Sequence, residues 1–401
     1  MLFRSCATGA LSAAHVPPLA GLDTFKGESY HTGRWPSEQN VKFAGKRIGV
    51  IGTGSSGIQS IPVIAEQAGH LTVFQRTAQY TIPAGNRPTD PKDVERAHKH
   101  WPEIRRIMTT TPIGSPVEAS STSAREHTPE QRRAVFEAAW KKGGLGGVLV
   151  ESYYDIVTDE EVNGWLADFV REKIRVTIKD PQTAEKLMPD YFIATKRQVQ
   201  DEVYYENFNR DNVRLVDLRA DPIVEVTENG IRTESGEHEL DMIVFATGFD
   251  AMTGALLRID VQGREGLPLK DKWSAGPRTY LGLASAGFPN LFMMTGPGSP
   301  SVLANMVTGI EQHAEYIAEA IAWADGHKIA SFEAELEAED KWVEIVNMRA
   351  DATLYPQCNS WYLGANVPGK PRVFMPFLGF PDYVAMVDEV AAKGYEGFRR
   401  G

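Results

Sequence analysis

Cysteine is scarce in this 401-residue sequence, which contains only Cys6 and Cys358. Two cysteines are too few for a disulfide framework, and neither they nor the nine scattered histidines have the spacing of metal ligands, so we predict no metal site. No apolar run reaches the roughly 18 residues that a membrane span needs, and the first residues do not resemble a secretory signal. The net charge of −11 disfavours a nucleic-acid partner. These absences favour a cytoplasmic globular enzyme of at least two domains that uses organic cofactors.

The clearest pattern that is present is a glycine-rich turn between an apolar strand, 48–51, and a helical segment, followed by a second strand, 71–74. The turn reads G-x-G-x-x-G, and this strand–turn–helix–strand context predicts a dinucleotide site. The first glycine permits the tight turn, the second lets the backbone approach the pyrophosphate, and the third lets helix pack on strand. Pro62 lies inside the helix, where we expect a bend. The predicted cofactor-binding residues are Gly52, Thr53, Gly54, Ser55, Ser56, Gly57 and Gln59.

The residues after the second strand indicate which cofactor is bound. NAD-specific sites usually place an acidic residue there, whereas this sequence has Gln75-Arg76-Thr77. Arg76 can pair with the 2′-phosphate of NADP, which a carboxylate would repel, and Thr77 adds a hydroxyl donor. NADPH is therefore favoured over NADH. The alternative is that Arg76 is an ordinary solvated arginine.

The pattern between about 91 and 190 is helical, with capping boxes that begin at Thr128 and Thr158. We interpret it as a helical insertion that serves as scaffold or lid support. Strand patterns return at 213–216, 223–226, 230–233 and 242–245. Ala-Thr-Gly at 246–248 repeats the Ala-Thr-Gly at 7–9, which indicates that the glycine-loop unit is inserted within a larger domain. A later amphipathic helix is predicted to bury Ile310, Ala314, Ile317, Ala318 and Ile321.

Residues 25–36 read F-K-G-E-S-Y-H-T-G-R-W-P. This segment resembles the fingerprint F-x-G-x-x-x-H-x-x-x-W-P of the Baeyer–Villiger monooxygenases, in which it also precedes the NADP glycine loop. Related N-hydroxylating and flavin-containing monooxygenases usually have another aromatic residue in place of Trp35. The resemblance implies that His31 and Trp35 act from a linker between two cofactor domains and couple hydride transfer to oxygenation. Without it, His31 would be a hydrogen-bonded histidine and Trp35 a packing residue.

Further matches to this family extend over nearly the whole chain, and phenylacetone- and steroid-type members are the most similar. Thr195-Lys196-Arg197 resembles the segment that carries the family's active-site arginine. The resemblance implies that Arg197 is catalytic, because its fixed positive charge would stabilise a peroxide anion and the adduct that follows. It also implies that Lys196 reaches the 2′-phosphate of NADP.

Two later segments resemble parts of the family's substrate and cofactor sites. Residues 301–306 resemble the loop beside the flavin, which implies that Met306 borders the flavin. The residues implied to line the substrate pocket are Ser301, Val302 and Leu303. Residues 360–370, which include Trp361 and Asn366, resemble a mobile segment that closes over the nicotinamide, so Trp361 is implied to contact the cofactor.

The resemblance implies an NADPH- and O2-dependent flavin monooxygenase that converts ketones to esters or lactones through a peroxyflavin, with FAD and NADP as cofactors. The implied fold class is an α/β flavoprotein with two dinucleotide-binding domains, in which a Rossmann-like NADP domain with a helical insertion is inserted in an incomplete FAD domain. The implied divisions are 1–24 (remnant of the FAD domain), 25–40 (linker with the fingerprint), 41–90 and 191–240 (NADP domain), 91–190 (helical insertion) and 241–401 (C-terminal part of the FAD domain).

One departure from the family pattern leaves alternatives open. Family members begin with a separate glycine loop for FAD, and only one such loop is present here. We therefore expect an N-terminally truncated reading frame. The alternatives are an N-hydroxylating or sulfoxidising flavin monooxygenase, or an inactive NADP-binding fragment. The expected partners are a small-molecule ketone and O2, and the sequence predicts neither the particular ketone nor the oligomeric state.

Overall fold

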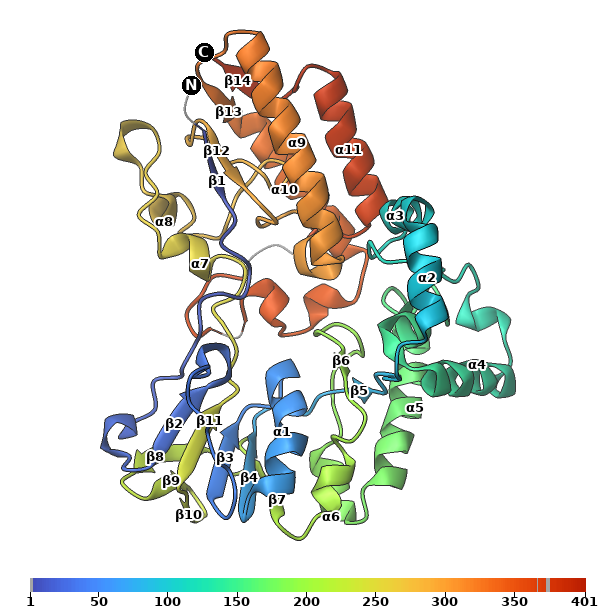
Figure 1. The fold of residues 1–401 in the computed structure, drawn as a ribbon, viewed down its shortest axis with the longest axis vertical. Helices are drawn as coiled ribbons and strands as arrows, with labels where there is room; N and C mark the ends of the chain where they lie inside the picture. Colours follow the sequence, from blue (N-terminus) through green and yellow to red (C-terminus); the bar gives the residue numbers. More distant parts are fainter. Residues whose placement is uncertain (1–2, 366, 373–375) are drawn as a thin grey trace. The chain divides into compact units, whose positions relative to one another are not determined.

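Contacts divide the chain into two compact units, each assembled from separate segments of the sequence. The computed structural model describes residues 3–365, 367–372 and 376–401. Unit 1 comprises Met1–Ala13, Arg87–Ser121 and Asp250–Gly401, and unit 2 comprises Ala14–Asn86 and Thr122–Phe249. The chain therefore passes from one unit to the other four times, and Figure 1 shows the elements of each.

The centre of unit 2 is a five-stranded parallel sheet with the order β2-β11-β3-β4-β7. Its strands are Glu28–His31 (β2), Met242–Phe245 (β11), Arg47–Ile51 (β3), His70–Gln75 (β4) and Val213–Asp217 (β7). The inner strands β11, β3 and β4 are mostly apolar because both faces of the sheet are covered there. Alternate residues confirm this, since Val50 and Val73 lie in one core cluster and Ile51 and Phe74 in another.

Different structures cover the two faces of this sheet. Helix α1 (Ser55–Gln67) packs on the first face and runs without interruption through Pro62, which is buried there. A three-stranded antiparallel sheet packs on the second face through Val226 and Ile231. Its strands are Ile223–Thr227 (β8), Gly230–Thr233 (β9) and Gly236–Glu239 (β10). The sequence did not predict β10, because its four residues, Gly-Glu-His-Glu, have no apolar alternation.

Unit 2 also contains three helices with side-chain N-caps: Pro129–Lys142 (α4), Glu160–Thr177 (α5) and Pro181–Lys186 (α6). The capping box predicted at Thr128 is confirmed, since the side chains of Thr128 and Gln131 each accept from the other's backbone N–H. The second predicted box is wrong by one residue. Asp159, not Thr158, caps α5, because its carboxylate accepts from two N–H groups of the first turn.

Unit 1 is mainly helical. Its long helices are Met306–Gly326 (α9), Leu336–Asp351 (α10) and Phe380–Ala392 (α11), and its shorter ones are Pro91–Lys99 (α2), Trp101–Thr110 (α3), Gly254–Leu257 (α7) and Leu269–Lys272 (α8). Strand β1 (Arg4–Cys6) pairs in parallel with β12 (Leu291–Met293), and β13 (Phe332–Ala334) pairs antiparallel with β14 (Phe398–Arg400). The core of this unit contains Trp342, Phe377 and Tyr383.

The buried face of α9 is rotated from the predicted one. Ile317 is buried as expected, but Ile310 and Ala318 are exposed, while Gly309 and His313 are buried. A glycine and a histidine therefore occupy the core-facing row, where an apolar pattern does not reveal them.

His313 is buried in unit 1 with both ring nitrogens bonded. Nδ1 accepts from the Thr295 N–H at 2.9 Å, and Nε2 lies 2.8 Å from the hydroxyl of Tyr383, which donates to the Leu281 carbonyl at 2.8 Å. Because Nδ1 accepts, the ring is neutral with its proton on Nε2. Burial lowers the pKa of His313 to about 4.

We predict that His313 makes unit 1 less stable in acid. The unfolded chain takes up a proton near pH 6.5 and the folded one only near pH 4, so the stabilising contribution is complete above pH 6.5 and is lost as the pH falls towards 4. The free energy of unfolding of the wild type, measured by denaturant titration, should fall relative to that of His313→Gln by about 1.4 kcal/mol per pH unit in this window. A difference that does not change with pH would contradict the assignment.

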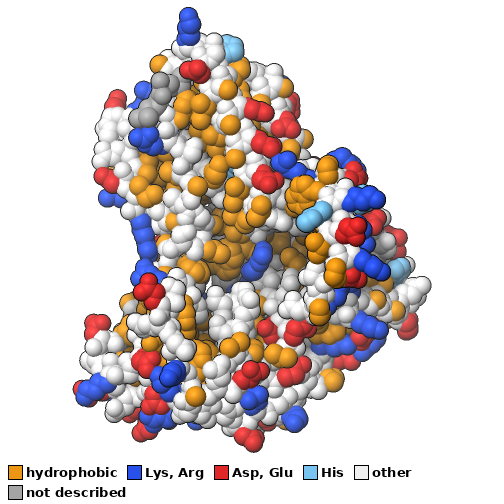
Figure 2. All heavy atoms as spheres, viewed as in Figure 1, with side chains coloured by type: hydrophobic (Ala, Val, Ile, Leu, Met, Phe, Trp, Pro, Cys, Tyr) orange, Lys and Arg blue, Asp and Glu red, His pale blue; other side chains and the backbone are white. Residues whose placement is uncertain are grey.

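The face drawn in Figure 2 carries acidic and basic side chains interspersed with one another. Exposed ion pairs in the described part of the chain include that of Arg133 with Glu172 at 2.8 Å. In the described part of the chain, no helix is long and apolar enough to cross a membrane. No three His, Cys, Asp or Glu side chains among the same residues are grouped so that they could hold a metal ion.

Candidate functional site

The glycine loop lies at the carboxyl end of β3, where the strand order of the unit 2 sheet reverses, since β4 lies on one side of β3 and β11 on the other. Open α/β sheets bind ligands at this position. Two of the three glycines are required by the packing of the protein itself. Gly52 has a φ of 107°, and a Cβ there would lie 2.5 Å from the Ala246 carbonyl oxygen. A Cβ at Gly57 would lie 2.2 Å from the Gly52 carbonyl oxygen.

Gly54 differs from the other two glycines, because no described atom from elsewhere in the chain lies within 4 Å of the position that a Cβ would take. Gly54 is also the N-cap of α1, and no side chain caps it. The N-terminus of this helix therefore presents backbone N–H groups and partial positive charge beside open space. This arrangement fits a pyrophosphate.

The predicted side chains around the loop have different surroundings. Thr53 is buried, and its hydroxyl donates to the Thr77 carbonyl at 2.9 Å, which holds the loop against the segment after β4. Gln59 donates to the Ser55 carbonyl and hydroxyl, each at 3.1 Å. Arg76 is exposed and forms no ion pair or hydrogen bond with any residue that the structure describes.

His31 is the last residue of β2 and is level with the end of β3, because both pair with Phe245. Its Nδ1 accepts from the Gly33 N–H at 3.0 Å, and its Nε2 is buried without a partner among the described residues. Burial lowers the pKa of His31, and the His15 and Gly248 carbonyls partly oppose this effect. A neutral His31 therefore lies at the same edge of the sheet as the glycine loop.

Trp35 follows His31 on the surface of unit 2 and is 38% exposed. Its ring packs against Tyr30 and Phe43, with centroid distances of 5.3 and 6.0 Å. In this unit Trp35 is a partly exposed packing residue, and nothing in the geometry gives it a direct chemical role.

Lys196 and Arg197 are separated by one residue, Gln198, from a short strand, Val199–Gln200 (β6), which pairs in parallel with Thr81–Ile82 (β5). Gln198 donates to the Tyr80 carbonyl at 2.7 Å. Because the pairing is parallel, the residues before β6 run alongside the residues that follow Thr77. Arg197 is exposed, and the Lys196 ammonium lies 5.0 Å from the ring centre of Tyr191.

The predicted residues of unit 1 are grouped together. Val302, Leu303, Met306 and Trp361 belong to one apolar cluster, although they come from separate parts of the sequence. Ser301 is buried beside Val302 with a φ of 42°, and its hydroxyl has no partner among the described residues. Asn366 of the predicted closing segment lies outside the described residues.

Two anchoring interactions were missed by sequence reasoning. Lys370 donates to the Asp250 carboxylate and, at 2.7 Å, to the Ala251 carbonyl, which holds one end of the 360–370 segment. Asn163 of α5 is fully buried and binds the backbone of Ile193, four residues before Arg197. The available signal was a polar residue on the otherwise apolar face of a predicted helix.

Comparison with known proteins extends these observations. No family model matches the chain. It is 42% identical over 398 residues to a cyclohexanone 1,2-monooxygenase of Acinetobacter sp, covering 99% of this chain and 72% of the relative. It is 43% identical to a Baeyer–Villiger monooxygenase of Pseudooceanicola batsensis and 41% identical to a phenazine N-monooxygenase of Lysobacter antibioticus, covering 98% of this chain in both cases and 71% and 72% of the relatives.

Solved structures agree. An oxidised steroid monooxygenase bound to NADP superimposes with a TM-score of 0.92 and 51% identity, covering 99% of this chain and 75% of that one. The fold and the glycine loop therefore place the protein among α/β flavoproteins with two dinucleotide-binding domains. The chain belongs to the Baeyer–Villiger monooxygenase family.

Proposed function

We propose that this protein is an NADPH- and O2-dependent monooxygenase that converts ketones to esters or lactones, with FAD and NADP as cofactors. Two observations support the proposal: the chain belongs to this family, and the second glycine of its glycine loop, Gly54, faces open space. We assign the NADP site to unit 2, where that loop lies. We assign the flavin to unit 1, where Met306, which is implied to border the flavin, belongs to an apolar cluster.

In this proposal some residues of the chain bind NADP, and Arg197 stabilises charge during the reaction. FAD, once reduced, supplies the redox chemistry with O2. The N-terminus of α1 binds the pyrophosphate of NADP, while Arg76 and Lys196 bind its 2′-phosphate. Arg197 supplies a guanidinium group, which stabilises negative charge on the reacting oxygen atoms.

His31 and Trp35 are assigned an indirect role. His31 is buried and neutral at the edge of the sheet, and Trp35 packs against Tyr30, the residue before His31, so both hold the fingerprint segment in place. Ser301, Val302 and Leu303 are assigned to the wall of the ketone pocket, where the buried Ser301 hydroxyl can bond a substrate oxygen. A cytoplasmic location is proposed from composition alone.

The test of the function is an isotope experiment with the purified protein, FAD and NADPH. Supplied with a cyclic ketone and ¹⁸O-labelled O2, it should form a lactone that carries one labelled oxygen, with the other released as water. Aromatic amines and thioethers are assayed in parallel, because one relative is a phenazine N-monooxygenase. Products from these substrates alone would replace ketone oxidation with heteroatom oxygenation. Peroxide as the sole product would refute the proposal.

We predict that Arg76→Ala weakens NADPH binding by about 10- to 100-fold, because charged hydrogen bonds of this kind are worth roughly 1.5–3 kcal/mol each. NADH has no 2′-phosphate, so its affinity should change less than about twofold. The measurement is fluorescence titration of the purified protein with each nucleotide. Arg214→Ala is the matched control, because Arg214 is also exposed and lies on β7 of the same sheet, away from the carboxyl ends of the strands. Equal losses for NADPH and NADH would contradict the assignment of Arg76.

A further inference from the structure

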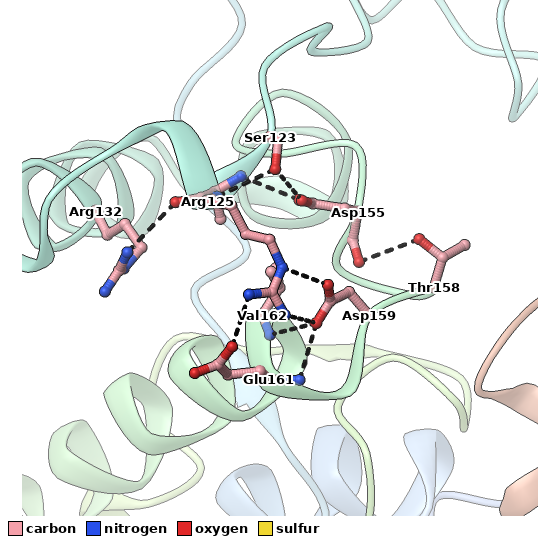
Figure 3. Close-up of polar contacts among 9 residues, drawn as sticks. Ser123, Arg125, Arg132, Asp155, Thr158, Asp159, Glu161 and Val162 are labelled. Carbon is pink, nitrogen blue, oxygen red and sulfur yellow. Dashed lines mark hydrogen bonds and ion pairs between the residues drawn. The ribbon is translucent and has the colours of Figure 1, made fainter.

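The start of helix α5 is held by a cluster of four hydrogen-bonded polar side chains: Ser123, Arg125, Asp155 and Asp159 (Figure 3). Arg125 donates to both oxygens of the Asp159 carboxylate, at 2.7 and 2.9 Å. Ser123 donates through its hydroxyl to Asp155, which also accepts from the Ala124 N–H at 3.2 Å. Asp159 in turn caps α5. The first turn of the helix is therefore fixed to the segment that precedes α4.

Asn163 projects from this first turn and is completely buried. Its Nδ2 donates to the carbonyls of Ile156 at 2.8 Å and Ile193 at 2.9 Å, and its Oδ1 accepts from the Ile193 N–H at 2.9 Å. Asn163 thus bonds both backbone groups of Ile193, as a neighbouring strand would. Buried backbone groups are costly to leave unpaired, so this contact fixes the position of Ile193.

Ile193 begins the segment 193–197, which ends at Arg197. Ala194 has a φ of 71°, a conformation that residues other than glycine adopt only when their surroundings hold them there. Thr195 is fully buried, and its hydroxyl donates to the Phe192 carbonyl at 2.6 Å. The hydrogen bond from Gln198 to Tyr80 fixes the chain immediately beyond Arg197. The backbone that carries Arg197 is therefore held on both sides.

We propose that Asn163 is a positioning residue for Arg197: it holds the segment 193–197 from helix α5 and so sets where the guanidinium lies. This inference rests on the proposed function, in which Arg197 stabilises charge on the reacting oxygens. It gives the helical layer a part in the reaction beyond that of scaffold. Charge stabilisation depends on placement, and an error of about 1 Å costs roughly 100-fold in rate.

The test compares Asn163→Leu with Asn209→Leu, which removes the same kind of contact elsewhere. Asn209 donates to the Thr177 carbonyl and accepts from the Lys179 N–H, both at 2.8 Å, at the other end of α5. Amide hydrogen exchange over residues 193–197 should rise at least about tenfold in Asn163→Leu and stay unchanged in Asn209→Leu. Ester formation should fall about 100-fold only in Asn163→Leu, with the KM for NADPH changed less than about threefold.

A double-mutant cycle distinguishes a positioning role of Asn163 from a non-specific loss of structure. When Arg197 is already replaced by lysine, adding Asn163→Leu should lower the rate of ester formation less than about threefold. The guanidinium that Asn163 positions is then already absent. Asn163→Asp, which keeps the acceptor for the Ile193 N–H, serves as the milder variant if Asn163→Leu does not fold. Unchanged exchange over 193–197, or additive losses in the cycle, would overturn the proposal. A wild-type protein that makes no ester would refute the proposed function instead, and the exchange data alone would then decide whether Asn163 holds this segment.

Discussion

Replacing Arg197 with alanine should reduce ester formation from ketones by at least about 100- to 1,000-fold, the range seen when one preorganised charge-stabilising donor is removed. The physical reason is that the negative charge on the reacting oxygens loses the one permanent positive charge that we assign to it. Flavin reduction by NADPH should stay within a few-fold of the wild type, because that step needs no such charge. The measurements are product yield by gas chromatography and anaerobic flavin reduction by stopped-flow absorbance.

Two comparisons make the Arg197 prediction specific. Arg197→Lys keeps the charge but loses the planar donor fork, so it should retain more activity than Arg197→Ala and still fall well below the wild type. Arg214→Ala removes an exposed arginine of the same unit and should leave ester formation unchanged. Ester formation at a near-normal rate in Arg197→Ala would remove Arg197 from the reaction. Parallel loss of flavin reduction and ester formation would instead indicate a defect in nucleotide binding.

The second large effect is expected at the glycine loop, where Gly54→Ala should weaken NADP binding and Gly57→Ala should destabilise the fold. At Gly54 the φ of −77° suits alanine and the space is open, so the melting temperature should change little. The added methyl group would nevertheless occupy space that the pyrophosphate needs, and NADP affinity should fall at least about tenfold, or roughly 1.4 kcal/mol. Calorimetric titration with NADP measures the loss.

Gly57→Ala should instead destabilise unit 2 even without a ligand. Its Cβ would lie 2.2 Å from the Gly52 carbonyl oxygen, so α1 must move away from the end of β3. Overpacking of this kind costs about 1–3 kcal/mol, which differential scanning fluorimetry would detect as a lower melting temperature. If Gly54→Ala bound NADP normally while Gly57→Ala was destabilised as expected, the loop would be a packed turn rather than a nucleotide site.

The sequence predicted much of unit 2 because its signals are local. A strand, a glycine turn and a helix that follow one another within about twenty residues fix their own geometry, as in 48–67. The capping box at Thr128 was predictable for the same reason. Where two candidate caps are adjacent, as at Thr158 and Asp159, the carboxylate of Asp159 forms the cap, and composition alone did not separate them.

The predictions that failed depend on partners outside the element itself. The buried row of α9 contains His313 because Thr295 and Tyr383, which lie far along the chain, satisfy both ring nitrogens. Strand β10 forms because its backbone pairs with that of the preceding strand, β9, although its own side chains are mostly polar. Asn163 lacked an interpretation because its partner, Ile193, is thirty residues away. Periodicity reports which face of an element is apolar and not which polar group will find a partner there.

By itself, the sequence determined the class of the protein, the glycine loop with its NADPH-type ending, and the family fingerprint, because short spacings of residue types set these features. Only the tertiary structure decided that Gly54 alone of the three glycines faces open space, and that His31 ends level with the loop. It alone showed that Asn163 binds the backbone four residues before Arg197. The physical reason is that empty space, strand register and buried hydrogen bonds are properties of pairs of segments, which exist only once the chain has folded.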